Sequence, residues 1–392
     1  MYPILIRVLA GVLIAFALSA CDSDGPTEAP LDDAPEILWE VPGALASRPI
    51  IIDSLVVTAF TDGRLAAFHR GTGAQVWVEH ITGLSRPRLL RSGDALLLDD
   101  GWLQIFDAHR GYARWGLGES QPNRLRWPTT VISGSTMYTA QSNTLAARDA
   151  VTGIQKWSTL LPWGTVTLGP ALSDNLVLVP VQFPAEDFQE PFPVFLIAYD
   201  RGTGSERWRV SLPDASEFSP SVGAVVGAVV AGDRVLVGTR AGRVLAFGLS
   251  DGKELWNRGS GESGAAGYNT YAPVLHGGLA VFVRTDGVLE ARVPSNGEVQ
   301  WTLSGAFAGN PFSPQLQPPV PCAPYLCAVD GNRLVLIDAA GRIAWQTDPA
   351  VFRVNTSPAV DSDGTMYIWA LYSPGDARLA AMRGAVRAGA TP

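Results

Sequence analysis

A short pattern recurs seven times along the chain and limits the folds that it can adopt. Each copy has a small apolar residue, a glycine six positions later and a tryptophan four positions after the glycine, as in Ala147, Gly153 and Trp157. Two looser copies have Ile105 and Val335 in place of the alanine. The seven tryptophans are Trp77, Trp115, Trp157, Trp208, Trp256, Trp301 and Trp345. A regular recurrence of this kind predicts a repeat architecture.

One copy of the pattern predicts a β-hairpin. Apolar residues before the glycine alternate as in a half-buried strand, for example in 244–247. The glycine accepts a positive φ and lets the chain reverse in a tight turn. A two-stranded hairpin cannot bury a tryptophan by itself, so each repeat needs the next one as a second wall.

The period of the repeat predicts a propeller. Successive tryptophans lie 38 to 51 residues apart, which is the length of a four-stranded blade. A proline also marks each predicted inner strand, at positions 49, 87, 128, 170, 220, 273, 314 and 358. The chain begins this array with Trp39 on a lone strand and ends it with a blade that lacks its last strand. We therefore predict an all-β fold of eight four-stranded antiparallel blades, in which the N-terminal strand closes the last blade.

The N-terminus reads as a targeting segment. Val8 to Leu18 is an apolar run, too short to span a bilayer, and it leads into Leu18-Ser-Ala-Cys21. This order predicts a lipoprotein signal peptide over 1–20, with the lipid attached to Cys21; the alternatives are an ordinary signal peptide or an uncleaved anchor. An acidic, flexible tether should cover 21–35, the propeller 36–383 and a disordered tail 384–392.

Composition and motifs argue against several classes of function. A net charge of −8 and a pI near 5.1 argue against nucleic-acid binding. The four histidines are scattered, and we predict no catalytic residue, no cofactor-binding residue and no metal ligand. Cys322 and Cys327 lie five positions apart with no histidine nearby, so they form either a disulfide or a pair of buried thiols.

The insertions predict a binding face. The longest one lies between the second and third strands of the fourth blade, and the long inter-blade loops 212–220, 258–270 and 303–313 belong to the same face. Exposed aromatic residues among acids are typical of an interface, although they could instead fold back onto the blade rim. The candidate partner-binding residues are Phe183, Glu186, Asp187, Phe188, Glu190 and Phe192.

The repeat resembles that of a known family. The pattern Ala-x-Asp-x-x-Thr-Gly-x-x-x-Trp at 147–157 is similar to the pyrroloquinoline-quinone (PQQ)-type propeller repeat, and Ser-Arg-Pro opens blades at 47–49 and 85–87. Together with the lipoprotein start, these features resemble the BamB lipoproteins of the machinery that assembles outer-membrane β-barrels. The resemblance implies a lipid-anchored, periplasm-facing scaffold without enzymatic activity or cofactor, whose partners are envelope proteins of that machinery.

Three features keep alternatives open. The family's Leu-x-Leu-Arg partner contact has no counterpart in loop 161–169, which lacks an arginine. The resemblance implies the outer membrane, whereas Asp22, directly after the lipidated cysteine, favours the inner membrane in enteric bacteria. Quinoprotein dehydrogenases have similar repeats, so a PQQ-dependent dehydrogenase is the alternative function; those enzymes carry an adjacent cysteine pair and a calcium site.

Overall fold

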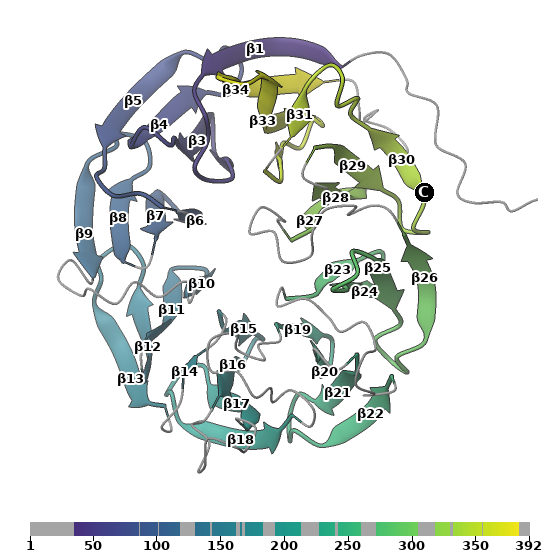
Figure 1. Ribbon diagram of the computed structural model, residues 1–392. Helices are drawn as coiled ribbons and strands as arrows, with labels where there is room; N and C mark the ends of the chain where they lie inside the picture. The colour runs from purple at the N-terminus through teal and green to yellow at the C-terminus, as the bar shows by residue number, and fades with distance from the viewer. Residues whose placement is uncertain are drawn as a thin grey trace, which may run out of the picture.

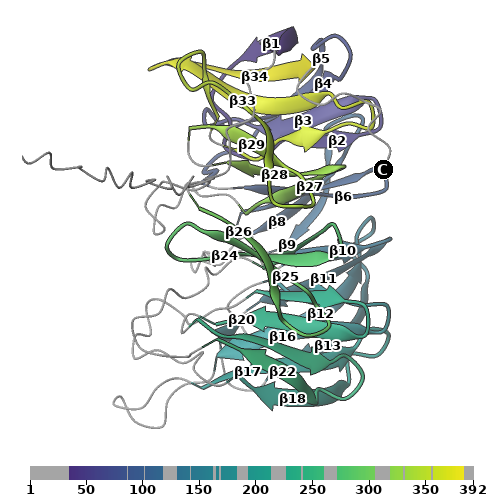
Figure 2. The ribbon, with the colours of Figure 1, turned by 90° about the vertical axis from the view of Figure 1, so that its right-hand side faces the viewer.

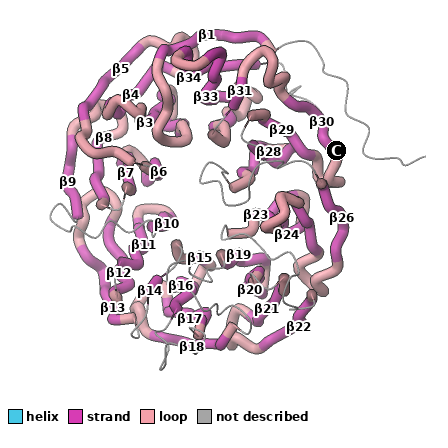
Figure 3. Tube along the Cα trace, viewed as in Figure 1, coloured by secondary structure: helices cyan, strands magenta, loops and turns pink. Residues whose placement is uncertain are grey.

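The computed structural model describes residues 35–383 except 86, 101, 118–129, 142, 162–164, 167–168, 183–192, 213–226, 240–241, 260–271, 305–317, 330–331 and 355. These residues form strands and turns, as the tube view shows (Figure 3). None of them belongs to a helix that is long and apolar enough to cross a membrane.

The described residues contain thirty-four strands, which form eight sheets arranged in a ring around a central axis (Figure 1). Blade 1 contains β2 (Ile50–Ile52), β3 (Leu55–Ala59), β4 (Arg64–His69) and β5 (Gln75–His80). Blade 2 contains β6 (Arg88–Ser92), β7 (Ala95–Asp99), β8 (Leu103–Asp107) and β9 (Ala113–Leu117). Blade 3 contains β10 (Thr130–Ser133), β11 (Thr136–Gln141), β12 (Thr144–Asp149) and β13 (Gln155–Leu160). Blade 4 contains β14 (Thr165–Val166), β15 (Ala171–Leu172), β16 (Leu176–Gln182), β17 (Val194–Asp200) and β18 (Glu206–Ser211).

The second half of the ring repeats this order. Blade 5 contains β19 (Ala228–Ala231), β20 (Arg234–Gly238), β21 (Val244–Gly248) and β22 (Glu254–Arg258). Blade 6 contains β23 (Val274–His276), β24 (Leu279–Val283), β25 (Leu289–Arg292) and β26 (Val299–Leu303). Blade 7 contains β27 (Val320–Cys322), β28 (Tyr325–Val329), β29 (Leu334–Ile337) and β30 (Ile343–Gln346). Blade 8 contains β31 (Arg353–Val354), β32 (Ala359–Val360), β33 (Met366–Ser373), β34 (Asp376–Arg383) and β1 (Glu36–Pro42).

The N-terminal strand closes the ring. β1 pairs antiparallel with β34, from Glu36 opposite Arg383 to Pro42 opposite Arg378, and the two strands lie side by side in both views (Figures 1 and 2). Arg378 reinforces the contact by donating from Nη1 to Glu40 Oε2 at 2.6 Å. The predicted eight-bladed, N-terminally closed propeller is therefore confirmed.

The hydrophobic core lies between neighbouring blades. Val57 and Leu65 of blade 1, for example, belong to one buried cluster with Leu96 and Leu98 of blade 2. The alternation of the strands puts every second side chain on each face of a blade, so both faces contribute to such clusters. The repeat tryptophans lie at these junctions.

Each repeat tryptophan from Trp39 to Trp301 contacts the hairpin glycine of the following blade. A Cβ atom built on that glycine would lie 2.4–2.8 Å from the indole ring, so a larger residue would fit only if the ring or the hairpin backbone moved. The indole Nε1 also donates to a carbonyl of the same hairpin. These bonds run from Trp39 to Arg70 (2.8 Å), Trp77 to Ala108 (2.9 Å), Trp115 to Val151 (2.9 Å), Trp157 to Arg201 (3.0 Å), Trp208 to Leu249 (3.0 Å), Trp256 to Pro294 (3.1 Å) and Trp301 to Ala339 (3.1 Å). The Gly–Trp pattern therefore encodes a junction between two blades.

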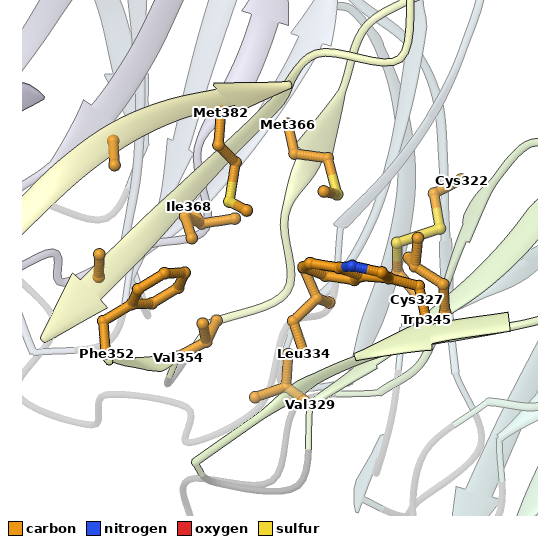
Figure 4. Packing of buried hydrophobic residues seen from close by; sticks show 13 residues of the cluster. Cys322, Cys327, Val329, Leu334, Trp345, Phe352, Val354, Met366, Ile368 and Met382 are labelled. Carbon is orange, nitrogen blue, oxygen red and sulfur yellow. A yellow bond between two sulfur atoms is a disulfide. The ribbon is translucent and has the colours of Figure 1, made fainter. Parts of the chain in front are cut away.

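The junction between blades 7 and 8 differs. Blade 8 takes its third and fourth strands from opposite ends of the chain, so it has no hairpin glycine for Trp345. Within the described residues, Trp345 Nε1 has no hydrogen-bond acceptor, and its ring packs in a buried cluster with the cysteine pair, Met366 and Met382 (Figure 4).

Blade 7 departs from the other blades in two details. Trp345 pairs with Leu336 and not with Val335, because the blade-7 hairpin is one residue shorter than the others. Its Gly341 N–H donates to the carbonyl three residues back, whereas Gly153 N–H donates four residues back. The residue that directly precedes the inner strand of blade 7 is Pro319; the predicted marker, Pro314, lies outside the described residues.

Candidate functional site

The predicted lipid-attachment and partner-binding residues lie outside the described part of the chain. This holds for Cys21, for the candidate partner-binding loop 183–192 and for the greater part of the three long inter-blade loops. In loop 161–169, Leu161 is buried, with 4 % of the residue exposed, and Thr165–Val166 form β14. Partner binding by loop 183–192 and the neighbouring long loops therefore stays a prediction.

The two cysteines of the propeller are joined. Cys322 of β27 and Cys327 of β28 form a disulfide across the inner hairpin of blade 7, and both residues are buried. Their cluster faces blade 8 (Figure 4). Among the described residues, no three His, Cys, Asp or Glu side chains are grouped so that they could hold a metal ion. Cys322 and Cys327 are five positions apart, so they are not the adjacent cysteine pair of a quinoprotein dehydrogenase.

A groove lies on the side of the ring where the first strand of a blade turns into the second and the third into the fourth. We call this side the hairpin face, since antiparallel order brings both turns to the same end of the blade. The groove has a volume of about 1260 Å³ and extends over blades 3, 4 and 5. Its walls include the β10–β11 turn, the β15–β16 turn and the β17–β18 hairpin.

Arg201 of the β17–β18 hairpin lies in the wall of this groove. Its Nε donates to the Tyr138 hydroxyl at 2.8 Å, and its Nη1 donates to the carbonyl oxygens of Ser173 at 2.9 Å and Asp174 at 3.4 Å. Its backbone carbonyl accepts the bond from Trp157, whose ring lies 6.0 Å from that of Tyr138. The Arg201 guanidinium is therefore held in place by uncharged acceptors.

The acids of the groove are mostly engaged elsewhere. Asp200 Oδ1 accepts hydrogen bonds from the N–H groups of Gly202 and Thr203, while Oδ2 pairs with Arg207 at 2.6 Å. The hydrogen bonds from Arg207 and then from Thr203 lower the pKa of Asp200 to about 2. Asp233 pairs with Arg234 at 2.8 Å.

Lys156 adds a second positive charge to the groove. Its Nζ donates to Thr136 Oγ1 at 2.5 Å and forms no ion pair with a described carboxylate. Its charge contributes, after the Thr152 hydrogen bonds, to lowering the pKa of Asp149. The groove can therefore attract an anionic group beside Arg201 and Lys156.

Sequence reasoning missed this groove because it treated the hairpins as equivalent. The residue whose carbonyl accepts the tryptophan bond is uncharged in five of the seven hairpins and is arginine only at Arg70 and Arg201. Each of these arginines lies near a tyrosine of the preceding blade, Tyr367 and Tyr138 respectively. Aligning the repeats by their tryptophans would have revealed this pair.

Comparison with known proteins supports a relationship to BamB. A family model described as "Outer membrane protein assembly factor BamB" matches residues 195–383. The outer membrane protein assembly factor BamB of Yersinia pestis is 25% identical over 153 residues, so the match spans only 38% of this chain and 38% of that relative.

Solved structures share the fold over most of the chain. BamB from Moraxella catarrhalis superposes with a TM-score of 0.62 at 14% identity, covering 89% of this chain and 100% of that chain. Quinohemoprotein alcohol dehydrogenase ADHIIG from Pseudomonas putida HK5 gives a TM-score of 0.64 at 12% identity, covering 89% of this chain and 76% of the enzyme. At such identities the structures establish the fold alone. Taken with the family match, the repeat and the closed ring, they make this chain a BamB-like β-propeller of PQQ-type repeats.

Proposed function

We propose that this protein is a lipid-anchored, periplasm-facing, non-catalytic scaffold that binds proteins during the assembly of outer-membrane β-barrels. The observation that carries the proposal is the match of residues 195–383 to the family model described as an outer membrane protein assembly factor. The closed eight-bladed ring supports it, because such a ring offers two broad faces without an exposed sheet end. Anchoring through Cys21 and partner binding through loop 183–192 are parts of the same proposal.

Affinity capture tests the proposal. The tagged protein, solubilised in detergent from its own envelope, should retain components of the β-barrel assembly machinery. Replacing Phe183, Phe188 and Phe192 by Ser should weaken that capture and leave the melting temperature nearly unchanged, because a surface loop contributes little to the inter-blade core. Lys253→Ala, on the hairpin face, is the matched control and should capture normally. Undiminished capture by the triple variant would remove the loop from the proposal.

The anchor is tested separately. Cys21→Ser should move the protein from the membrane fraction to the soluble periplasmic fraction, because acyl chains on this cysteine would supply the attachment. Membrane association that persists without acylation points to another anchor. Separating inner from outer membranes of the unaltered strain tests the outer-membrane location against the effect of Asp22.

The alternative function is tested with the cofactor itself. A quinohemoprotein alcohol dehydrogenase shares the fold at 12% identity, and a likeness at this level concerns the architecture alone. Purified protein incubated with PQQ and calcium should show no stoichiometric quinone absorbance and no dye reduction with alcohols or sugars. Uptake of the quinone together with substrate oxidation would replace the scaffold proposal.

A further inference from the structure

Two junctions of the ring share a set of side chains that the described residues of the other junctions lack. Between blades 8 and 1, the Trp39 ring lies 5.8 Å from Tyr367 and donates to the Arg70 carbonyl. Between blades 3 and 4, Trp157 lies 6.0 Å from Tyr138 and donates to the Arg201 carbonyl. Each junction therefore holds a tyrosine, a tryptophan and an arginine in corresponding places.

At the junction of blades 8 and 1, the arginine has an internal carboxylate partner. Arg70 Nη1 lies 2.8 Å from Asp361 Oδ2 and 3.0 Å from Oδ1. Asp361 directly follows β32, and only 8 % of its side chain is exposed. A buried carboxylate of this kind satisfies both the charge and the hydrogen-bonding needs of the guanidinium.

At the junction of blades 3 and 4, the corresponding position holds a serine. In blade 8, Val360 pairs with Met366, the residue before Tyr367, and Asp361 comes next. In blade 3, Ile132 pairs with Met137, the residue before Tyr138, and Ser133 comes next. Register thus places Ser133 where blade 8 has Asp361.

The missing carboxylate coincides with an open groove. Ser133, Tyr138 and Arg201 all line it, and Arg201 forms no ion pair with a described carboxylate. Lys156 adds a second cation, whereas the exposed Asp174 carries a negative charge that would repel the carboxylate of a ligand. The volume of about 1260 Å³ exceeds what a small carboxylate fills, since pockets for small molecules run from roughly 300 to 1,000 Å³.

We propose that this groove binds an acidic segment of a partner polypeptide, whose aspartate or glutamate carboxylate pairs with Arg201 as Asp361 pairs with Arg70. The remaining groove, with Trp157, Leu172 and Leu249 in its walls, receives the chain on either side of that acid. The site lies on the hairpin face, and it does not depend on the role in β-barrel assembly or on loop 183–192.

The test uses the purified propeller and a randomised library of capped octapeptides that each carry one central glutamate. A matched library carries glutamine at the same place. The glutamate peptides should be enriched, and the best of them should bind about ten- to a hundredfold more tightly than its glutamine counterpart in calorimetry, which is the usual gain from a charge-assisted hydrogen bond. No enrichment, or equal binding of both peptides, overturns the proposal.

Three variants locate the site. Arg201→Gln should abolish the preference for glutamate, while Arg342→Gln removes the same charge from an arginine of blade 7 that is 78 % exposed and should not affect it. Asp174→Asn should tighten binding, because it removes a like charge from the groove. A preference that survives Arg201→Gln overturns the assignment.

Ser133→Asp keeps the proposal testable even if Arg201→Gln unfolds the protein. This variant restores the carboxylate that blade 8 has, so it should occupy Arg201 from within, abolish the glutamate preference and leave the melting temperature equal or higher. Undiminished glutamate binding by Ser133→Asp contradicts the proposal. Succinate that binds as tightly as the best peptide would also overturn the proposal, because the groove would then be a site for small free carboxylates.

Discussion

The junction between blades 1 and 2 and the junction between blades 7 and 8 bury a tryptophan equally well, but by different means. Trp77 and Trp345 are 8 % and 6 % exposed. Trp77 covers Gly111 and donates to the Ala108 carbonyl, whereas Trp345 has neither a glycine nor a described acceptor and packs among sulfur-containing and aliphatic side chains. The difference teaches that the tryptophan belongs to the inter-blade core, while the glycine and the hydrogen bond belong to the hairpin of the following blade.

Removing residues 36–41 should give the largest effect. The deletion takes away most of the pairing between β1 and β34 and the Trp39 junction in one step. The loss in the free energy of unfolding should exceed the roughly 3–5 kcal/mol typical of a single buried Trp→Ala change. Chemical denaturation measures it, and an unchanged transition would contradict the closure by β1.

Alanine at two glycines separates strain from packing. Both have a positive φ, +81° at Gly341 and +90° at Gly375, so each Gly→Ala change costs about 1–2 kcal/mol in backbone strain. Only at Gly341 would the new Cβ meet an indole ring, 2.4 Å from Trp301. Gly341→Ala should therefore cost a further 1–3 kcal/mol or so. Equal melting temperatures for the two variants would refute the role of the indole contact.

Removing the disulfide should weaken the junction between blades 7 and 8 alone. Cys322→Ala with Cys327→Ala opens a bridge between residues five positions apart, for which the chain-entropy model gives about 2 kcal/mol. Because the bridge shares a cluster with Trp345, its loss should be non-additive with Trp345→Ala by at least about 0.5 kcal/mol. The loss of the disulfide should be additive with Trp77→Ala. Coupling of equal size to both tryptophans would contradict the difference between the two junctions.

Phenylalanine at the two tryptophans isolates the hydrogen bond. Trp77→Phe and Trp345→Phe remove the same volume, but only the first leaves a carbonyl oxygen, that of Ala108, without its donor. Trp77→Phe should be more destabilising by about 1–2 kcal/mol. The comparison fails if urea unfolding gives the same midpoint shift for both variants.

Acid titration should give the smallest effect. The pKa of Asp200 is lowered to about 2 by Arg207 and Thr203, so its contribution is fully present above the unfolded value near 4 and is lost as the pH falls through about 2. The melting-temperature difference between the unaltered protein and Asp200→Asn should stay constant from pH 6 to about 4 and shrink below that. A constant difference down to pH 2 would show that Asp200 does not stabilise the β17–β18 hairpin through its negative charge.

The sequence was enough to predict the eight blades and their closure, because the spacing of Gly153 and Trp157 recurs in seven blades and Trp39 begins the array on a lone strand. It was not enough for blade 7, where a hairpin shorter by one residue moves the partner of Trp345 from Val335 to Leu336. A one-residue change in a turn leaves the glycine-to-tryptophan spacing intact and alters only the pairing.

The groove could not be predicted from the sequence, because its distinguishing feature is a missing carboxylate at the position that corresponds to Asp361. Aligning the tryptophans would reveal Arg201, but its difference from Arg70 emerges only when Ser133 is compared with Asp361, and the two turns that carry these residues differ in length. Strand register, which the structure supplies, is needed to align them. The loops that the sequence did favour, above all 183–192, are tested by binding experiments and not by the fold.

The pairing of Glu36 with Arg383 joins residues that are 347 positions apart, which sets the order of events when the protein is made. β1 is synthesised first and must wait for β34, so the ring stays an open arc until nearly the whole chain has emerged. Contacts of such long range form slowly. Until they form, the open arc exposes the unpaired edges of β1 and β34, which are complementary to each other. Two arcs that meet at this stage can exchange their N-terminal strands and close around one another as an intertwined dimer.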